Sequence, residues 1–337
     1  YLFYDLKMRN IISITLIFFT FGSNFLLGFD ELKPYKIAFG SCIEQNYPVR
    51  AWKPIKDEQI DAFFFLGDNV YGDTLNGKLD KMAISYTTLE KNLPNWLFDK
   101  EIFAIWDDHD YGLNDGGADY PLKEDAQVLF NDFWNIPAND SRRKRSGIYF
   151  KKTIKKSDKE ILLVGLDTRY FRSNLIKGDN DAYLPNNNPE ATILGTDQWQ
   201  WLEKTLKGNY DMLIIATSIQ LLATQHRFEK WSNFPHERQR LLNLLHNLES
   251  EVLVVSGDRH RAGIYLKENI IELTASSMNL SKFKQYETDP LLYSETYPEN
   301  NYGVVEIAPK EIIISIKSET GAVLESVKID TTKGVIN

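Results

Sequence analysis

The sequence predicts an α/β domain in which two sheets pack together with helices outside them. Several runs of strand length are apolar throughout, as expected for strands that are covered on both faces. These runs alternate with segments of helical pattern, which favours parallel strands joined by helical crossovers. Near the C-terminus the pattern changes to alternating strands separated by turn residues, which predicts an antiparallel hairpin that closes the domain.

In the first half of the chain, apolar runs that end in glycine or acidic residues indicate strands, and longer mixed segments indicate helices. Strands are expected at residues 36–39, 61–66, 102–106 and 148–150. Helices are expected at residues 51–60, 78–91 and 126–134.

The second half continues the alternation after a polar, asparagine-rich stretch at residues 173–189, which reads as a long surface loop. Strands are expected at residues 160–166, 211–216, 251–255, 263–266 and 270–274. Helices are expected at residues 195–206 and 235–248, and the C-terminal strands at residues 304–307, 312–317 and 323–329.

Composition narrows the possible partners. The 337 residues carry a formal net charge of −8, which disfavours nucleic acid or an anionic membrane as the main partner, because both require a basic surface. An anionic substrate would have to be attracted by a local patch or by bound metal ions. Cys42 is the only cysteine, so the chain forms no internal disulfide.

The N-terminal segment predicts export. Met8-Arg9 precedes an apolar run at residues 11–21, and Gly22-Ser23-Asn24 follows it, as in a secretory signal peptide. We therefore expect residues 1–29 to be a signal peptide or N-terminal anchor and residues 30–337 to form the enzyme domain. Any membrane attachment is expected only through this segment, and the chain is expected to be a monomer.

The stretch at residues 101–115 gives the clearest chemical signal. An apolar run ends abruptly in Asp107, Asp108, His109 and Asp110. Four ionisable groups at a strand end repel one another or take up protons unless a cation lies among them. Ligands bind at the strand ends of α/β sheets, so this pattern predicts a metal site.

Polar, potentially coordinating residues follow six of the apolar runs. They are Cys42, Asp68 with Tyr71, Asp108 with His109, Asp167 with Arg169, Ser218 with Gln220, and Asp258 with His260. This recurrence suggests that the strand ends meet at one centre, where a carboxylate could bridge two ions about 3.5–4 Å apart. Taken singly, Cys42 could be a buried thiol, Asp68 could belong to an Asx turn, and Asp258 with His260 could take part in an internal ion pair. The Asp107-Asp108-His109-Asp110 run has no comparable structural explanation.

The ordered motifs resemble those of the PhoD-like alkaline phosphatase D family, in the metallophosphatase (calcineurin-like phosphoesterase) superfamily. They are Gly40-Ser41-Cys42, Gly67-Asp68-Asn69-Val70-Tyr71-Gly72, Trp106-Asp107-Asp108-His109-Asp110, Leu166-Asp167-Thr168-Arg169 and Ser256-Gly257-Asp258-Arg259-His260. The resemblance implies a four-layer α/β/β/α sandwich that hydrolyses phosphate mono- or diesters, with two metal ions, typically Fe³⁺ and Ca²⁺, and Zn²⁺, Mn²⁺ or Mg²⁺ as alternatives.

The resemblance also implies roles for individual residues. Asp68 would bridge both metals, with Cys42, Tyr71 and His260 on the first and Asp108 and Asp258 on the second. His109 would act as general acid or as a hydrogen-bond donor to the phosphate, oriented by Asp110, and Arg169 would offset charge on the phosphoryl oxygens.

One departure leaves the substrate open. The loop reads His109-Asp110-Tyr111-Gly112-Leu113-Asn114-Asp115, which differs from the pattern common among bacterial members. The alternatives are a phospholipase or nucleotide-type phosphodiesterase, an exported protein that binds metal or phosphate without turnover, and a calcium-stabilised surface protein.

Overall fold

The structure is a computed structural model that describes residues 33–74, 78–332 and 335–336. The expected signal peptide or anchor at residues 1–29 lies outside the described residues. Within the described ranges, no helix is both long and apolar enough to cross a membrane.

The first sheet has parallel strands on one side and an antiparallel C-terminal extension on the other. Its order is β15-β14-β13-β12-β1-β2-β3, with β1 parallel to β2 and antiparallel to β12. The strands are β1 (Tyr35–Gly40), β2 (Ala62–Leu66), β3 (Glu101–Ile105), β12 (Asn301–Ile307), β13 (Glu311–Ser318), β14 (Val323–Asp330) and β15 (Val335–Ile336).

The second sheet has the order β10-β11-β9-β8-β5-β4, with parallel strands in the middle and antiparallel strands at both edges. Its strands are β4 (Phe150–Lys156), β5 (Lys159–Gly165), β8 (Met212–Ala216), β9 (Glu251–Ser256), β10 (Ala262–Lys267) and β11 (Ile270–Ala275).

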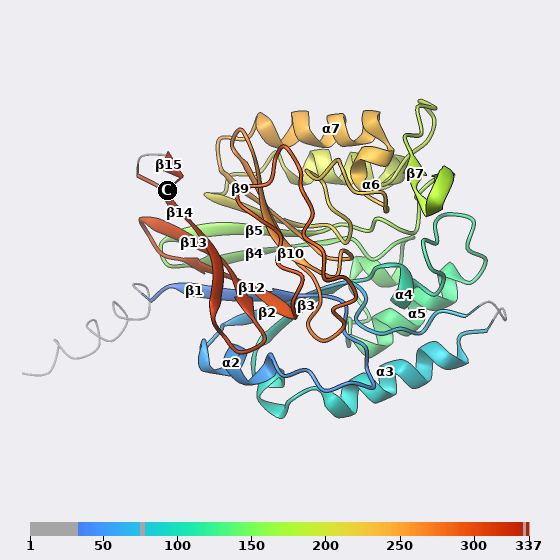
Figure 1. The fold of residues 1–337 in the computed structure, drawn as a ribbon, viewed down its shortest axis with the longest axis horizontal. Coiled ribbons are helices and arrows are strands. Elements are labelled where there is room, and N and C mark those ends of the chain that lie inside the picture. The colour runs from blue at the N-terminus through green and yellow to red at the C-terminus, as the bar shows by residue number, and fades with distance from the viewer. Residues whose placement is uncertain (1–32, 75–77, 333–334, 337) are drawn as a thin grey trace, which may run out of the picture.

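Helices cover the outer faces of the two sheets (Figure 1). On one side are α2 (Trp52–Asp57), α3 (Asp80–Asn92) and α5 (Lys123–Phe133), and on the other are α6 (Gly195–Thr205) and α7 (Pro235–His246). The one-turn helix α4 (Asp108–Tyr111) follows β3 directly. This arrangement confirms the predicted four-layer α/β/β/α sandwich.

Burial explains why the apolar runs form central strands. Every residue of β2 and β8 is buried, as parallel strands require when both faces of the sheet are covered. Between the sheets, the rings of Phe64 on β2 and Phe150 on β4 lie 5.9 Å apart. On the outer face of the second sheet, Trp199 and Leu202 of α6 pack in the same cluster as Ile215 of β8.

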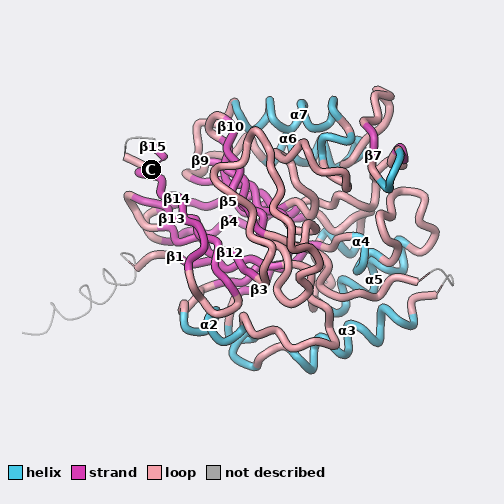
Figure 2. Tube along the Cα trace, in the orientation of Figure 1, coloured by secondary structure: helices cyan, strands magenta, loops and turns pink. Residues whose placement is uncertain are grey.

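Three sequence expectations require correction or extension. The strand expected at residues 148–150 begins only at Phe150 and continues to Lys156. The loop expected at residues 173–189 contains the short strands β6 (Ile176–Lys177) and β7 (Tyr183–Leu184), which pair with each other. The C-terminal hairpin is part of a meander that extends the first sheet (Figure 2).

Short 3-10 helices lie at Asn95–Asp99, Ser141–Arg143, Asp179–Asp181 and Trp231–Asn233.

Candidate metal centre

The site forms where the carboxyl ends of strands from both sheets meet. Cys42 follows β1, Asp68 follows β2 and Asp108 follows β3, all in the first sheet. Asp258 and His260 follow β9 in the second sheet. Donor atoms from these five residues lie together in overlapping groups, so the expected convergence of the strand ends is found in the structure.

Four of these residues have left-handed backbone conformations. The φ angles are 55° at Cys42, 49° at Asp68, 63° at Asp258 and 50° at His260. Side chains other than glycine rarely adopt this region, and local strain of this kind clusters at functional sites. The chain therefore bends sharply after β1, β2 and β9, at residues whose side chains enter the site.

Asp68 is the shared member of the centre. Its carboxylate belongs to all three groups of side chains whose donor atoms lie within 4.8 Å of one another in the described part of the chain. The groups are Cys42, Asp68 and His260; Asp68, Asp108 and His109; and Asp68, Asp107, Asp108 and Asp258. A carboxylate in this position is placed to bridge two cations.

The first group has a mixed set of donor atoms. The Sγ atom of Cys42 lies 3.5 Å from Oδ2 of Asp68, and the Tyr71 hydroxyl lies 3.3 Å from the same oxygen. The Tyr71 hydroxyl is also 3.4 Å from Nε2 of His260. Nδ1 of His260 is 2.6 Å from the carbonyl oxygen of Leu280, which fixes the ring and leaves Nε2 toward the site.

The charge balance of the site favours bound cations. Burial raises the pKa of Asp68 and of Asp258 well above the usual aspartate range, and burial raises the pKa of Asp107 to about 7. Within the described ranges, Oδ2 of Asp107 is buried without a hydrogen-bond partner. Because ionised carboxylates this crowded repel one another, metal cations fit the chemistry of these donors.

His109 lies beside the centre and is held by Asp73. Nδ1 of His109 is 2.8 Å from Oδ1 of Asp73. Burial alone would lower the pKa of His109, but the carboxylates of Asp108, Asp68 and Asp73 raise it to about 10. The ring is therefore disposed to carry a proton in the acidic surroundings.

Asp110 does not contact the His109 ring, contrary to the orienting role expected for it. Its carboxylate accepts hydrogen bonds from the backbone amides of Asp107 and Asp68, at 2.6 and 3.2 Å, and from Nδ2 of Asn69 at 2.6 Å. This acid sits at the third position of the α4 turn and therefore reaches back to the amides that begin the turn. Its contacts fix the backbone of the two strand ends.

Arg169 is fully buried, which differs from the expected contact with a phosphoryl group. Its Nε donates to Oδ1 of Asp107 at 2.6 Å, and its Nη1 donates to Oε2 of Glu229 at 2.5 Å. Nε of Arg172 lies 2.8 Å from Oε1 of Glu229. In this arrangement Arg169 balances the charge of carboxylates beneath the centre.

Replacing Arg169 by alanine is expected to destabilise the fold. The change would leave Asp107 and Glu229 buried without their shared cation, and breaking a buried ion pair from one side costs about 3–5 kcal/mol. Denaturant unfolding would measure the loss. The control is Arg50→Ala, since the pair of Arg50 with Glu319 is solvent-exposed and should contribute at most about 1 kcal/mol. Equal losses for the two variants would contradict the assignment.

Other polar residues at the strand ends serve mainly to support the site. The Ser218 hydroxyl donates to Oδ1 of Asp107 at 2.5 Å, whereas Nε2 of Gln220 turns away and donates to Thr274. Asp167 accepts from the Trp106 indole at 2.9 Å and from nearby amides, so it is a structural acid.

The loop after α4 also approaches the centre. The amide of Asp115 donates to Oδ2 of Asp108 at 2.8 Å, while its carboxylate accepts from the Tyr183 hydroxyl at 2.6 Å. This hydrogen bond links the short strands β6 and β7 to the loop that follows α4. Glu229, Asp73 and Tyr183 are contacts that the sequence did not indicate, because they come from loops without a recognisable pattern.

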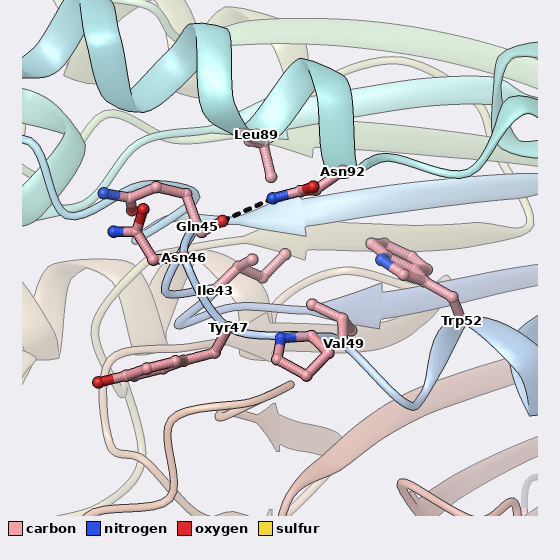
Figure 3. A pocket seen from close by; sticks show the side chains of 9 residues that line it. Ile43, Gln45, Asn46, Tyr47, Val49, Trp52, Leu89 and Asn92 are labelled. Carbon is pink, nitrogen blue, oxygen red and sulfur yellow. Dashed lines mark hydrogen bonds between the residues drawn. The ribbon is translucent and has the colours of Figure 1, made fainter.

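A separate pocket of about 380 Å³ lies beside the loop that follows Cys42 (Figure 3). Its lining includes Trp52, Leu89 and Asn92, and Nδ2 of Asn92 donates to the carbonyl oxygen of Gln45 at 2.8 Å. Oε1 of Gln45 accepts from the amide of Tyr71 at 2.9 Å. The pocket contains none of the expected metal ligands, but Gln45 connects its wall to the centre.

Comparison with known proteins identifies the family. The model of the PhoD-like phosphatase family matches residues 135–323, which is more than half of the chain. No curated protein matches the sequence.

Solved structures share the fold at low sequence identity. A structure of PhoD is 17% identical, with a TM-score of 0.68, and the match covers 91% of this chain and 72% of that one. GAP50, described as the anchor in the inner membrane complex of Plasmodium, is 14% identical over 88% and 89% of the two chains, with a TM-score of 0.61. A dimetal phosphatase from Danio rerio is 12% identical over 89% and 99%, with a TM-score of 0.55.

The family match and the geometry complement each other. The matched range includes Asp258 and His260, whereas Cys42, Asp68 and Asp108 precede it and are placed in the site by the fold. A phosphatase family and groups of side chains suited to metal ions support hydrolysis of phosphate esters with metal ions. The chain therefore belongs to the PhoD-like phosphatase family and is a metal-dependent phosphoesterase that acts on small-molecule phosphate esters.

Proposed function

We propose that the protein is an exported, monomeric phosphatase that hydrolyses phosphate mono- or diesters with two metal ions bridged by Asp68. The observation that carries the two-ion proposal is that Asp68 belongs to every group of candidate ligands in the described ranges. The signal-like segment before residue 30 supports export.

The donor types favour two different cations. Cys42, Tyr71 and His260 would hold the first ion, and their thiolate, phenolate and imidazole groups suit Fe³⁺ or another transition metal such as Zn²⁺. Asp108 and Asp258 would complete an oxygen-rich site for a hard ion such as Ca²⁺, Mn²⁺ or Mg²⁺. Asp107 is a further candidate on this side, because its Oδ2 has no hydrogen-bond partner among the described residues.

The bound ions would supply an activated water and neutralise the phosphoryl oxygens. Water attacks phosphorus, the bond from phosphorus to the leaving oxygen breaks, and a proton passes to the leaving alcohol. His109 is the proton donor in this proposal: Asp73 holds Nδ1, and Nε2 has no hydrogen-bond partner in the described part of the chain. Asp110 and Arg169 act as positioning residues beneath the centre, through the backbone of Asp68 and through Asp107.

The choice between monoester and diester depends on the loops around the centre. The deciding loops are expected within residues 113–145 and 173–193, and the contact between Asp115 and Tyr183 links the two ranges. A phospholipase or nucleotide-type phosphodiesterase would use the same centre with a different loop surface.

Removal of metal is expected to abolish hydrolysis. Purified protein would be tested by metal analysis and by turnover of para-nitrophenyl phosphate and its bis-ester, before and after chelation and after metal readdition. Chelation should remove the metal and both activities, and readdition should restore them. The ratio of the two untreated rates identifies the preferred ester. Full activity in protein that is free of metal would contradict the proposed function.

A further inference from the structure

One segment outside the assigned centre lies directly against it. Residues 279–286, between β11 and β12, supply the Leu280 carbonyl that contacts Nδ1 of His260 at 2.6 Å. Two side chains farther along the segment, Lys282 and Phe283, also lie close to expected ligands. Nζ of Lys282 lies 5.2 Å from the centre of the Tyr71 ring, and the rings of Phe283 and His260 lie 6.4 Å apart at 72°. The segment therefore borders the half of the centre that contains Tyr71 and His260.

Lys282 is an exposed cation beside an acidic centre. Among the described residues, its amine has no hydrogen bond or ion pair, and it lies over the Tyr71 ring. A lysine ammonium is a point charge on a flexible stem that suits phosphate recognition.

Phe283 continues into a small aromatic surface. Its ring lies 5.6 Å from the ring of Phe228, and both side chains are partly exposed. Buried guanidinium groups lie beside these rings: Arg259 is 4.5 Å from the Phe228 ring centre, and Arg261 is 5.7 Å from that of Phe283. The two rings are thus fixed in place by cation contacts and are available for contact with a planar group.

We propose that Lys282 and Phe283 form a substrate-binding wall, in which Lys282 binds a phosphoryl oxygen and Phe283, with Phe228, packs against an aromatic leaving group. This inference rests on the proposed function, since it places the phosphoryl group at the metal centre. It names the substrate class as phosphate esters of alcohols that carry an aromatic ring. The cation and the ring lie on consecutive residues, so one segment recognises both parts of the substrate.

The two roles predict separable kinetic defects. Lys282→Gln should lower kcat/KM about 5-fold or more for both para-nitrophenyl phosphate and glycerol phosphate, because both substrates carry the phosphoryl group. Phe283→Ala should lower kcat/KM about 3- to 10-fold for para-nitrophenyl phosphate only, which is the range expected for loss of an aromatic pair. Each variant is compared with wild type on the same substrate, so differences in leaving-group reactivity cancel.

Neighbouring residues on the same segment provide matched controls. Lys284→Gln removes an exposed lysine two positions away, and Tyr286→Ala removes an exposed aromatic side chain. Neither contacts a residue of the centre in the described structure, so both should retain wild-type kinetics. Metal content and thermal unfolding of every variant would show whether the centre and the fold are intact.

Binding of inorganic phosphate separates this inference from the proposed function. Calorimetric titration of the metal-loaded protein requires no turnover, and Lys282→Gln should weaken phosphate binding about 5-fold or more while Phe283→Ala leaves it unchanged. If wild type binds phosphate but hydrolyses neither ester, the proposed function fails and the Lys282 contact is still tested. Equal phosphate affinity in Lys282→Gln and Lys284→Gln would overturn the role of Lys282. Equal losses on both esters in Phe283→Ala, or loss of its metal, would overturn the packing role.

Discussion

Alanine at position 68 is expected to remove both metal ions and nearly all hydrolysis. Asp68 is the carboxylate shared by all the candidate ligand groups, and no other side chain in the described ranges belongs to all three. The rate should fall by more than the about 10²–10³-fold that loss of one electrostatic contact to a transition state costs. Metal analysis and turnover of para-nitrophenyl phosphate would measure the two losses together.

The control for this variant is Asp132→Ala, which removes a solvent-exposed aspartate of α5 that pairs with Arg143. It should retain metal and activity. Misfolding is checked by comparing the metal-free proteins. Burial opposes ionisation of Asp68, so metal-free Asp68→Ala should unfold no more readily than metal-free wild type. An Asp68→Ala protein with both ions and normal turnover would disprove the bridge.

His109→Ala should slow hydrolysis about 10²- to 10⁴-fold, the range typical of general acid catalysis. The loss should be greater for glycerol phosphate than for para-nitrophenyl phosphate, because a poor leaving group depends more on the proton it receives. Asp73→Asn should show the same substrate pattern with a smaller effect, since Asp73 acts through the ring of His109. Steady-state kinetics with the two esters would measure these differences.

His246→Ala is the matched control, because His246 is half-exposed near the end of α7 and pairs with Glu268. Metal content should be unchanged in both histidine variants. A uniform loss on the two esters, or a loss explained by missing metal, would show that His109 does not donate a proton. A rate within a few-fold of wild type would eliminate it from the chemistry altogether.

Much of the centre could be predicted from the sequence, because the residues around strand ends follow a recognisable local pattern. An apolar run followed within two residues by Asp, His or Cys indicates both a buried strand and the side chain at its end, as at Asp68 and Asp258. Parallel strands bring such tips to one edge of a sheet. Side chains supplied by loops lack this pattern, which explains why Asp73, Glu229 and Lys282 became visible only in the structure.

Local sequence patterns did not predict the lysine-rich part of β4 or the pairing of strands that lie far apart in the sequence. Strand β4 contains Lys151, Lys152, Lys155 and Lys156, and its position at the sheet edge, where lysines deter pairing with other chains, explains this polar composition. The pairing of β1 with β12 joins residues more than 260 positions apart, and no local pattern encodes it. Asp110 is adjacent to His109 in sequence, yet the α4 turn directs its carboxylate back toward the amides of Asp68 and Asp107.

The left-handed backbone at Cys42, Asp68, Asp258 and His260 sets the stability of the fold against the supply of metal ligands at the same positions. Glycine would relieve the strain, most at cysteine and histidine because aspartate tolerates this region better, but glycine carries no ligand. Glycine at these four positions would therefore favour thermal stability, but it would remove the side chains that the proposed activity requires. The strain at these four residues is therefore a cost in stability that accompanies their role as candidate ligands.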